Sequence, residues 1–209
     1  MSQFQIFQVE KNNEDIRRTV LTNTIKMLTE RGVLKSENLE STIKKLIDNP
    51  TDDNIYIINK DKYKEKEKQK IAIKIFTTKI TSISKQSQIN DFLNKHQVYH
   101  KIIIVKSINT KSGQYLVANF PETELFLEHE LMVNLIDSTL VPRYEVQEKE
   151  TEEFKTFCEL YQCKKRNIPK ILAGDKMAKY YNLKKGDIVR IIRPSETSGY
   201  SPYYRIFVN

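Results

Sequence analysis

The C-terminal stretch, residues 168–209, constrains the fold most, because turn-forming residues divide it into short segments of defined type. The whole chain has only five glycines and six prolines, and three of each fall in this stretch. Residues 188–193 and 203–208 are rich in β-branched and aromatic residues and are therefore predicted strands. Asp175 is the predicted N-cap of a helix over residues 176–181, and residues 194–202 are predicted to be a polar loop. Together with an extended segment at Ile168, these elements form a strand–helix–strand–strand unit.

Three arginines surround the predicted loop. Arg190, Arg193 and Arg205 flank Ser195–Gly199, and the stretch contains no histidine. Forked guanidinium groups beside hydroxyls and one carboxylate suit a protein–protein docking surface. An ordinary solvated hairpin loop explains the same residues equally well.

A long series of residues in this stretch matches one protein family in order and with few gaps, which is far more specific than a single short motif. The series consists of Ile168-Pro-Lys-Ile171, Gly174-Asp175, Ala178, Tyr180-Tyr181, Leu183–Arg193, Ser195–Gly199 and Tyr204-Arg205. It resembles the C-terminal assembly domain of the fifth-subunit family of multisubunit DNA-dependent RNA polymerases. Upstream, Leu140-Val141-Pro142 resembles the hinge between the two domains of that family.

The resemblance implies a non-catalytic polymerase subunit with an N-terminal jaw domain, residues 1–139, and a C-terminal assembly domain, residues 140–209. It implies that the assembly domain docks on the largest polymerase subunit beside other subunits. The jaw would form part of the wall around downstream double-stranded DNA. The residues expected to bind the partner are Arg190, Arg193, Ser195, Glu196, Thr197, Ser198, Tyr204 and Arg205, with Leu140, Val141 and Pro142 as the hinge.

The N-terminal part of the chain is predicted to be an α/β layer. Apolar residues at helical spacing predict helices over residues 13–31 and 36–49, and β-rich runs predict strands at 54–59, 71–77 and 101–106. Ile102–Val105 is an uninterrupted apolar run, as expected for a strand covered on both faces. Strands that alternate with helices favour an α/β fold. The resemblance adds that this jaw is an inactive, restriction-endonuclease-like α/β domain and that the assembly domain is a small α+β domain.

Thr110, Lys111 and Ser112 are the candidate DNA-proximal residues. The resemblance places a turn that approaches downstream DNA here, and a lysine beside two hydroxyl groups suits contacts to phosphates. An ordinary surface turn is the alternative. The formal net charge of +8 favours a polyanionic partner, although general lysine-rich solvation explains the charge equally well.

A degenerate nuclease and a free nucleic-acid-binding protein are the alternative functions. A nuclease of this fold needs two or three carboxylates around Mg²⁺, commonly an Asp followed by Glu-x-Lys. The run Ala72-Ile73-Lys74 keeps the lysine but has Ala where a carboxylate is needed, and Asp52 and Asp53 alone cannot build the site. No nuclease activity is therefore predicted. A free nucleic-acid-binding protein should expose aromatic residues along a basic stripe, whereas the aromatics here occupy apolar positions.

No metal, cofactor, small-molecule substrate or membrane is expected as a partner. Cys158 and Cys163 lie on or beside a predicted helix over residues 151–162, without the further Cys or His that a zinc site needs. No apolar run approaches the roughly 18 residues of a membrane span, and no signal peptide is predicted. The expected location is intracellular. It is the nucleus if the gene is cellular, and the host cytoplasm or the virion if the gene belongs to a large DNA virus.

Overall fold

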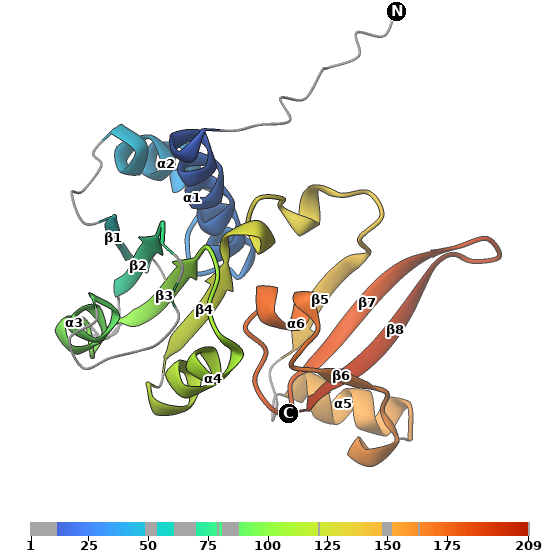
Figure 1. The fold of residues 1–209 in the computed structure, drawn as a ribbon. Helices are drawn as coiled ribbons and strands as arrows, with labels where there is room; N and C mark the ends of the chain where they lie inside the picture. Colours follow the sequence, from blue (N-terminus) through green and yellow to red (C-terminus); the bar gives the residue numbers. More distant parts are fainter. Residues whose placement is uncertain are drawn as a thin grey trace, which may run out of the picture. The chain divides into compact units, whose positions relative to one another are not determined.

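The computed structural model of the chain describes residues 12–48, 54–60, 70–78, 80, 88–120, 122–147, 152–162 and 164–208. The chain divides into two compact units, Met1–Asn134 and Leu135–Asn209 (Figure 1). Each unit is built around its own four-stranded sheet. A mixed α/β chain with two sheets agrees with the predicted class, and the predicted domain boundary between residues 139 and 140 stays a prediction.

The N-terminal unit contains a mostly parallel sheet. Its strands are β1 (Ile55–Asn59), β2 (Lys70–Phe76), β3 (His100–Val105) and β4 (Thr123–Leu127), in the order β1-β2-β3-β4. β1 runs antiparallel to β2, whereas β2, β3 and β4 are parallel to one another. The carboxyl ends of β2, β3 and β4 therefore meet at one edge of the sheet.

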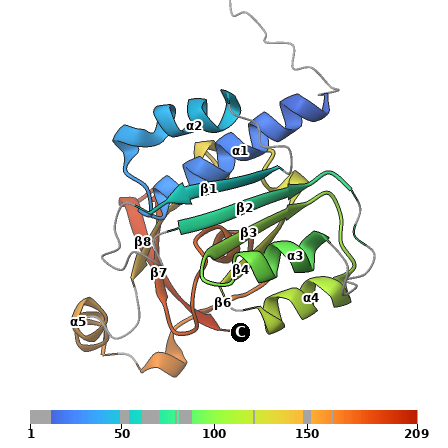
Figure 2. The ribbon, with the colours of Figure 1, turned by 90° about the vertical axis from the view of Figure 1, so that its left-hand side faces the viewer.

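Helices cover both faces of this sheet. Helix α1 (Asn13–Glu30) and helix α2 (Leu39–Asp48), preceded by the 3-10 turn η1 (Ser36–Asn38), lie on one face. Helix α3 (Gln88–Lys95) and helix α4 (Thr110–Asn119) lie on the other (Figure 1 and Figure 2). Because both faces are covered, β3 is buried from Lys101 to Val105, as its apolar sequence predicted.

The two apolar layers of the N-terminal unit follow from strand alternation. One layer joins Ala72 and Phe76 of β2 to Phe92 and Leu93 of α3 and to Leu116 of α4. Helix α1 buries its predicted stripe, including Val20, Leu21, Ile25 and Leu28. The predicted apolar stripe of α2 is only half-buried, since none of its residues falls in the buried class. Helix α2 is therefore a peripheral element of this unit.

A buried charged group ties the end of α1 to β3 and β4. Both terminal nitrogens of Arg31 donate to the two carboxylate oxygens of Glu124, each at 2.7 Å. His100 Nε2 lies 2.6 Å from Glu124 Oε1, and His100 Nδ1 lies 3.0 Å from Glu122 Oε2. The side chains of Arg31 and Glu124 are only 7% and 10% exposed. This geometry fixes the helix against the sheet by charge-assisted hydrogen bonds.

The C-terminal unit contains β5 (Arg143–Gln147), β6 (Lys170–Leu172), β7 (Ile188–Ser195) and β8 (Gly199–Val208), in the order β5-β7-β8-β6. Its helices are α5 (Glu152–Leu160) and α6 (Lys176–Tyr180). Short 3-10 turns η2 (Glu128–Glu130), η3 (Leu135–Asp137) and η4 (Lys165–Asn167) occur in connecting segments of the chain. The predicted N-cap is confirmed, because the Asp175 side chain accepts hydrogen bonds from the backbone N–H groups of Met177 and Ala178.

The predicted polar loop over residues 194–202 is wrong. β7 continues through Pro194 to Ser195, and β8 begins at Gly199, so only residues 196–198 form the turn. Pro194 pairs with Tyr200 and Pro202 with Ile192 in the antiparallel ladder. Because proline lacks a backbone N–H, its presence in a sequence argues against a strand. A strand with a free edge nevertheless tolerates proline, because the N–H groups along that edge form no ladder hydrogen bonds. The result is a long two-stranded hairpin.

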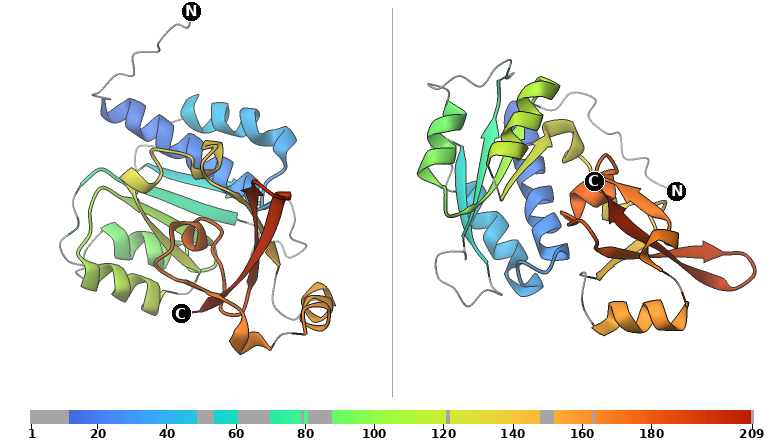
Figure 3. Two further views of the ribbon diagram at one scale, coloured as in Figure 1. Left: turned by 90° about the vertical axis from the view of Figure 1, so that its right-hand side faces the viewer. Right: turned by 90° about the horizontal axis from the view of Figure 1, so that it is seen from below.

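Helices α5 and α6 pack on opposite faces of the C-terminal sheet (Figure 3). On the α6 face, Ala178 and Leu183 pack against Val189, Ile191 and Phe207. On the α5 face, Phe157 packs against Ile168, Ile188 and Ile206. The predicted core role of the α5 stripe is thus confirmed for Phe157, whereas Tyr161 is half exposed. Cys158 is a partly buried cysteine of this helix, and Cys163 lies outside the described residues.

Candidate functional site

The β7–β8 hairpin separates the predicted partner-binding residues onto two faces. In the antiparallel ladder Val189 pairs with Arg205 and Ile191 with Tyr203, whereas Arg190 pairs with Tyr204. Cross-strand partners share a face, and neighbours along a strand point to opposite faces. Arg205 and Tyr203 therefore lie on the α6 face, and Arg190 and Tyr204 lie on the α5 face.

The α6 face carries an arginine–tyrosine–arginine stack. The guanidinium carbons of Arg193 and Arg205 lie 4.9 Å and 5.4 Å from the ring centroid of Tyr203. These distances are typical of cation–π contacts, which hold a guanidinium in place while its outer N–H groups remain available. Within the described part of the chain, the buried Nε–H of Arg205 has no hydrogen-bond acceptor. The stack is therefore a fixed pair of cations suited to carboxylates of a partner.

On the α5 face, Arg190 and Tyr204 form contacts inside the C-terminal unit. Arg190 Nη1 donates to Glu145 Oε2 of β5 at 3.2 Å. The Tyr204 ring lies 4.4 Å from the Phe157 ring and 5.5 Å from the Tyr161 ring, between centroids. Burial, followed by the hydrogen bond with Tyr161, raises the pKa of Tyr204 above its ordinary value. Arg190 and Tyr204 thus hold β5, the hairpin and α5 together, and their predicted partner contacts stay a prediction.

The hairpin tip is an exposed turn closed by hydroxyl groups. Ser195 Oγ lies 3.3 Å from Thr197 Oγ1 and accepts a hydrogen bond from the backbone N–H of Ser198 at 3.4 Å. Gly199 has a φ of 73°, a value that glycine adopts without strain. Glu196 is exposed between these residues. The structure therefore brings the predicted tip residues together, at a distance along the hairpin from Arg205.

Two exposed aromatic residues of the hairpin were missed by sequence reasoning. Tyr203 and Tyr200 are 37% and 72% exposed. Tyr203 and Arg205 are two apart in the predicted strand, which was the available signal that they share a face. Their relation to Arg193 was lost when residues 194–202 were assigned to a loop, because it depends on the pairing of β7 with β8.

The predicted DNA-proximal residues form the first turn of α4, not a free turn. Asn109 is the N-cap, and its side chain accepts a hydrogen bond from the backbone N–H of Lys111 at 3.4 Å. Thr110 and Lys111 are exposed, and Ser112 is half-buried. A helix N-terminus with an exposed lysine presents backbone N–H groups and positive charge to an anion.

The predicted hinge precedes β5. Leu140 is 91% exposed, and the backbone N–H of Val141 donates to the carbonyl oxygen of Ser138 at 3.1 Å. Pro142 lies directly before the first residue of β5. The hinge role of these residues stays a prediction.

The residues considered for a nuclease site lie in different surroundings. Ala72 is fully buried in the apolar layer under α3, and Lys74 of the same strand face is 8% exposed. Asp52 and Asp53 lie outside the described residues. Within the described ranges, no group of three or more His, Cys, Asp or Glu side chains could hold a metal ion. A search of those same ranges finds no helix long and apolar enough to cross a membrane.

Residues 133–207 match the family described as RNA polymerase Rpb5, C-terminal domain. A DNA-directed RNA polymerase subunit 5 from Acanthamoeba polyphaga mimivirus is 36% identical over 213 residues, which cover 97% of each chain. Subunit rpabc1 of the DNA-directed RNA polymerases I, II, and III from Dictyostelium discoideum is 34% identical over 56% of this chain and 61% of its own length. The corresponding RPABC1 subunit from Caenorhabditis elegans is 34% identical over 68% of this chain and 63% of its own length. Both cellular matches cover less than two thirds of the relative.

Proposed function

The chain belongs to the Rpb5/RPABC1 family, the subunit 5 family of DNA-directed RNA polymerases, and on this premise we propose that it is a non-catalytic subunit of such an enzyme. The observation that carries the proposal is the 36% identity to a viral subunit 5 across 97% of both chains. It takes part in transcription by the complex, whereas other subunits perform nucleotide addition. No cofactor or small-molecule substrate is assigned to it.

The C-terminal unit docks on the largest polymerase subunit through the α6 face of the hairpin. The stack of Arg193, Tyr203 and Arg205 supports this role, because it joins an aromatic ring to two guanidinium groups, and tyrosine and arginine are enriched at interface hot spots. The exposed tip, residues 195–198, extends the same surface with hydroxyl groups and one carboxylate. Arg190 and Tyr204 contribute by fixing the hairpin from its other face.

The N-terminal unit acts as an inactive, restriction-endonuclease-like jaw beside downstream double-stranded DNA. Its covered, mostly parallel sheet supports this assignment of fold. The first turn of α4 supplies Lys111, the Thr110 hydroxyl and backbone N–H groups toward DNA phosphates, which would position the duplex without reading its sequence. Leu140–Pro142 is the proposed hinge after this jaw. Similarity to a viral subunit supports a location in the host cytoplasm or the virion rather than in the nucleus.

Affinity purification of the tagged full chain from cells that express the polymerase tests the function. The largest subunit should be recovered with the tagged chain. The double variant R193E/R205E should abolish most of that recovery, because it places two carboxylates where two cations met the partner. R166E reverses the charge of an exposed arginine in η4, outside the hairpin, and is the control. Recovery of the chain without polymerase subunits would refute the proposal and favour a free nucleic-acid-binding protein.

A further inference from the structure

The outer part of the β7–β8 hairpin has no neighbouring strand among the described residues. β5 pairs with β7 only as far as Ile192, and β6 pairs with β8 only from Ile206 onward. Residues 193–203, which we call the distal hairpin, therefore extend beyond the four-stranded part of the sheet (Figure 1). A strand pair of this kind has two outer edges, and the backbone groups along an exposed edge are a template on which another strand can pair.

Two hydrogen bonds near the base of β8 show which of its backbone groups point outward. The N–H of Phe207 donates to the carbonyl of Asp187, the residue before β7, at 2.8 Å. The N–H of Ile206 donates to the carbonyl of Pro169, the residue before β6, at 2.8 Å. Because successive backbone groups of a strand point to opposite sides, odd-numbered residues of β8 direct their N–H toward β7 and even-numbered residues direct theirs outward.

The outward positions of the distal hairpin are Pro194, Tyr200 and Pro202. Pro194 pairs with Tyr200, and residues that face each other in an antiparallel ladder are either both turned inward or both turned outward. Proline has no N–H, so positions 194 and 202 offer only a carbonyl. The N–H of Tyr200 donates to the Ser198 carbonyl at 2.8 Å, and the Ser198 hydroxyl donates to the Tyr200 carbonyl at 3.4 Å. The two strands of the distal hairpin therefore have no free outward N–H.

The missing donors are not a consequence of burial. Tyr200 is 72% exposed, and Pro194 and Pro202 are exposed as well. Two of the six prolines of the chain lie in this hairpin, and both occupy outward positions, where proline removes no hydrogen bond from the β7–β8 ladder. At an inward position, by contrast, proline would remove one. The placement therefore leaves the hairpin intact but takes away the donors that a further strand would need.

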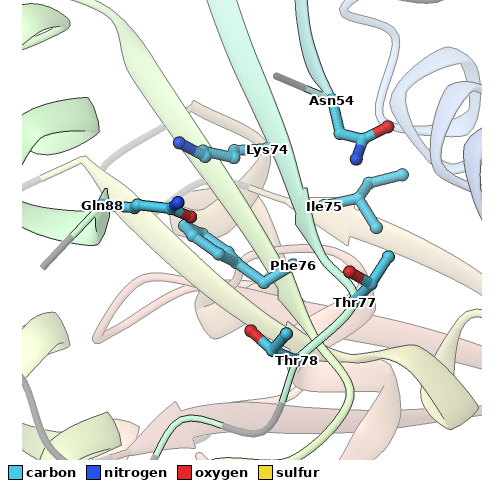
Figure 4. Close-up of a pocket in the computed structure, with 7 residues that line it drawn as sticks. All are labelled: Asn54, Lys74, Ile75, Phe76, Thr77, Thr78 and Gln88. Atoms are coloured by element: carbon cyan, nitrogen blue, oxygen red, sulfur yellow. The ribbon is translucent and has the colours of Figure 1, made fainter. Parts of the chain in front are cut away.

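The N-terminal unit satisfies an N–H near the end of a strand in another way. The N–H of Ile75 in β2 donates to the carbonyl of Asn54 at 3.2 Å, and Asn54 lies directly before β1 (Figure 4). Asn54 has a φ of 52°, a conformation that is uncommon for residues other than glycine. There a neighbouring segment accepts the hydrogen bond, whereas in the distal hairpin the donor itself is absent.

We propose that Pro194 and Pro202 close both edges of the distal hairpin to strand addition, so that a second copy of this chain cannot extend its sheet. An added strand needs alternating donors and acceptors, and it would meet carbonyls alone on either edge. A partner therefore binds the distal hairpin through side chains on a face, with carboxylates opposite Arg193 and Arg205. This last point rests on the proposed function, and the closed edges do not.

The experiment measures self-association of the full chain by sedimentation velocity over a range of concentrations. P194T/P202T restores one outward N–H on each edge with a residue that favours strands. This variant should self-associate at least about tenfold more tightly than the wild type, because each edge regains a hydrogen-bond donor. The amides introduced at positions 194 and 202 should be protected from hydrogen exchange in the associated form. S195T/S201T is the matched control, because it places the same residue in each strand at an inward position.

The control should behave as the wild type. A P194T/P202T variant that associates no more than the wild type would overturn the proposal. So would equal association of the control, because strand propensity and not the edge donors would then be the cause, or association without protection of the two amides. P202T opens one edge only and provides the same test if the double variant does not fold. Since no polymerase subunit is present, the outcome is separate from the recovery of the largest subunit, which tests the proposed function.

Discussion

Replacement of Glu124 by Gln should remove a large part of the stability of the N-terminal unit. The variant keeps the side-chain shape but removes the carboxylate that buried Arg31 and His100 share, and His100 then has only Glu122. Although burial alone would raise it, the pKa of Glu124 is lowered from 4.5 to about 2, because Arg31 and His100 stabilise the ionised form. A shift of this size corresponds to about 3 kcal/mol at neutral pH, which agrees with the cost of breaking a buried ion pair.

The sign of the pH dependence follows from the direction of each shift. The folded-state pKa of Glu124 is depressed, so its contribution is complete above about pH 4.5 and is lost as the pH falls through about 2. Burial lowers the pKa of His100, but hydrogen bonds to Glu122 and Glu124 outweigh it and raise the pKa above 6.5. The His100 contribution is therefore complete below pH 6.5 and is lost as the pH rises through the folded-state value. This unit should be most stable between about pH 4.5 and 6.5.

Hydrogen exchange of the β3 and β4 amides is the suitable assay, because it reports opening of the N-terminal unit alone. At pH 6, E124Q should lower the free energy of opening by about 3 kcal/mol, after correction for intrinsic exchange rates. E14Q is the control, because Glu14 forms an exposed ion pair with Arg18 on the same helix as Arg31. That variant should change the opening free energy by less than about 0.5 kcal/mol. A loss below about 1 kcal/mol in E124Q would refute the inference that this group stabilises the unit.

Three further outcomes are expected. K101M should lower the free energy of unfolding of the N-terminal unit by about 1–3 kcal/mol, because the Lys101 ammonium donates to three backbone carbonyls near the end of α3. A lower melting temperature would show this loss. G199A should cost about 1 kcal/mol in urea unfolding of the C-terminal unit, because residue 199 has a φ of 73°, whereas G174A meets no atom within 4 Å and should be neutral. K111A should reduce the slope of log K against log salt for DNA binding by the assembled polymerase by about one, whereas K95A should leave this slope unchanged. An equal effect of both variants would show that Lys111 acts only through the overall charge of the protein.

The N-terminal layer could be predicted from its sequence because local patterns and the fold agree there. Ile102–Val105 is a continuous apolar run, and the structure covers that strand on both faces. The stripe of α1 is periodic, and Asn12 caps the helix by accepting from the Asp15 N–H. The charged group around Glu124 could not be predicted, because its members are separated by up to 93 positions. The pairing of β3 with β4 brings His100 beside Glu122 and Glu124, and the packing of α1 on the sheet adds Arg31.

The β7–β8 hairpin, which we propose as the docking surface, could be located from the sequence only in part. The motif located the arginines and the tip. Their distribution between two faces depends on strand register, and no register could be assigned while residues 194–202 were predicted to be a loop. β5 was missed because Arg143–Gln147 has only a weak apolar pattern, and its pairing with β7 is a tertiary interaction. The burial of Lys74 was missed because a lysine inside a strand normally indicates an exposed position. Here two phenylalanine rings, one from a distant helix, surround it.

Because side chains alternate between the two faces of the β7–β8 hairpin, residues on one face can change without altering those on the other. Positions 193, 203 and 205 can vary while 190 and 204 continue to hold the unit together. A single-residue insertion within β8 would have the opposite effect. It would turn Arg205 toward α5 and Tyr204 toward the α6 face, while Arg190 and Arg193 of β7 kept their sides. Change in this arm should therefore proceed by substitution, or by adding residues in pairs, and rarely by a length change of one.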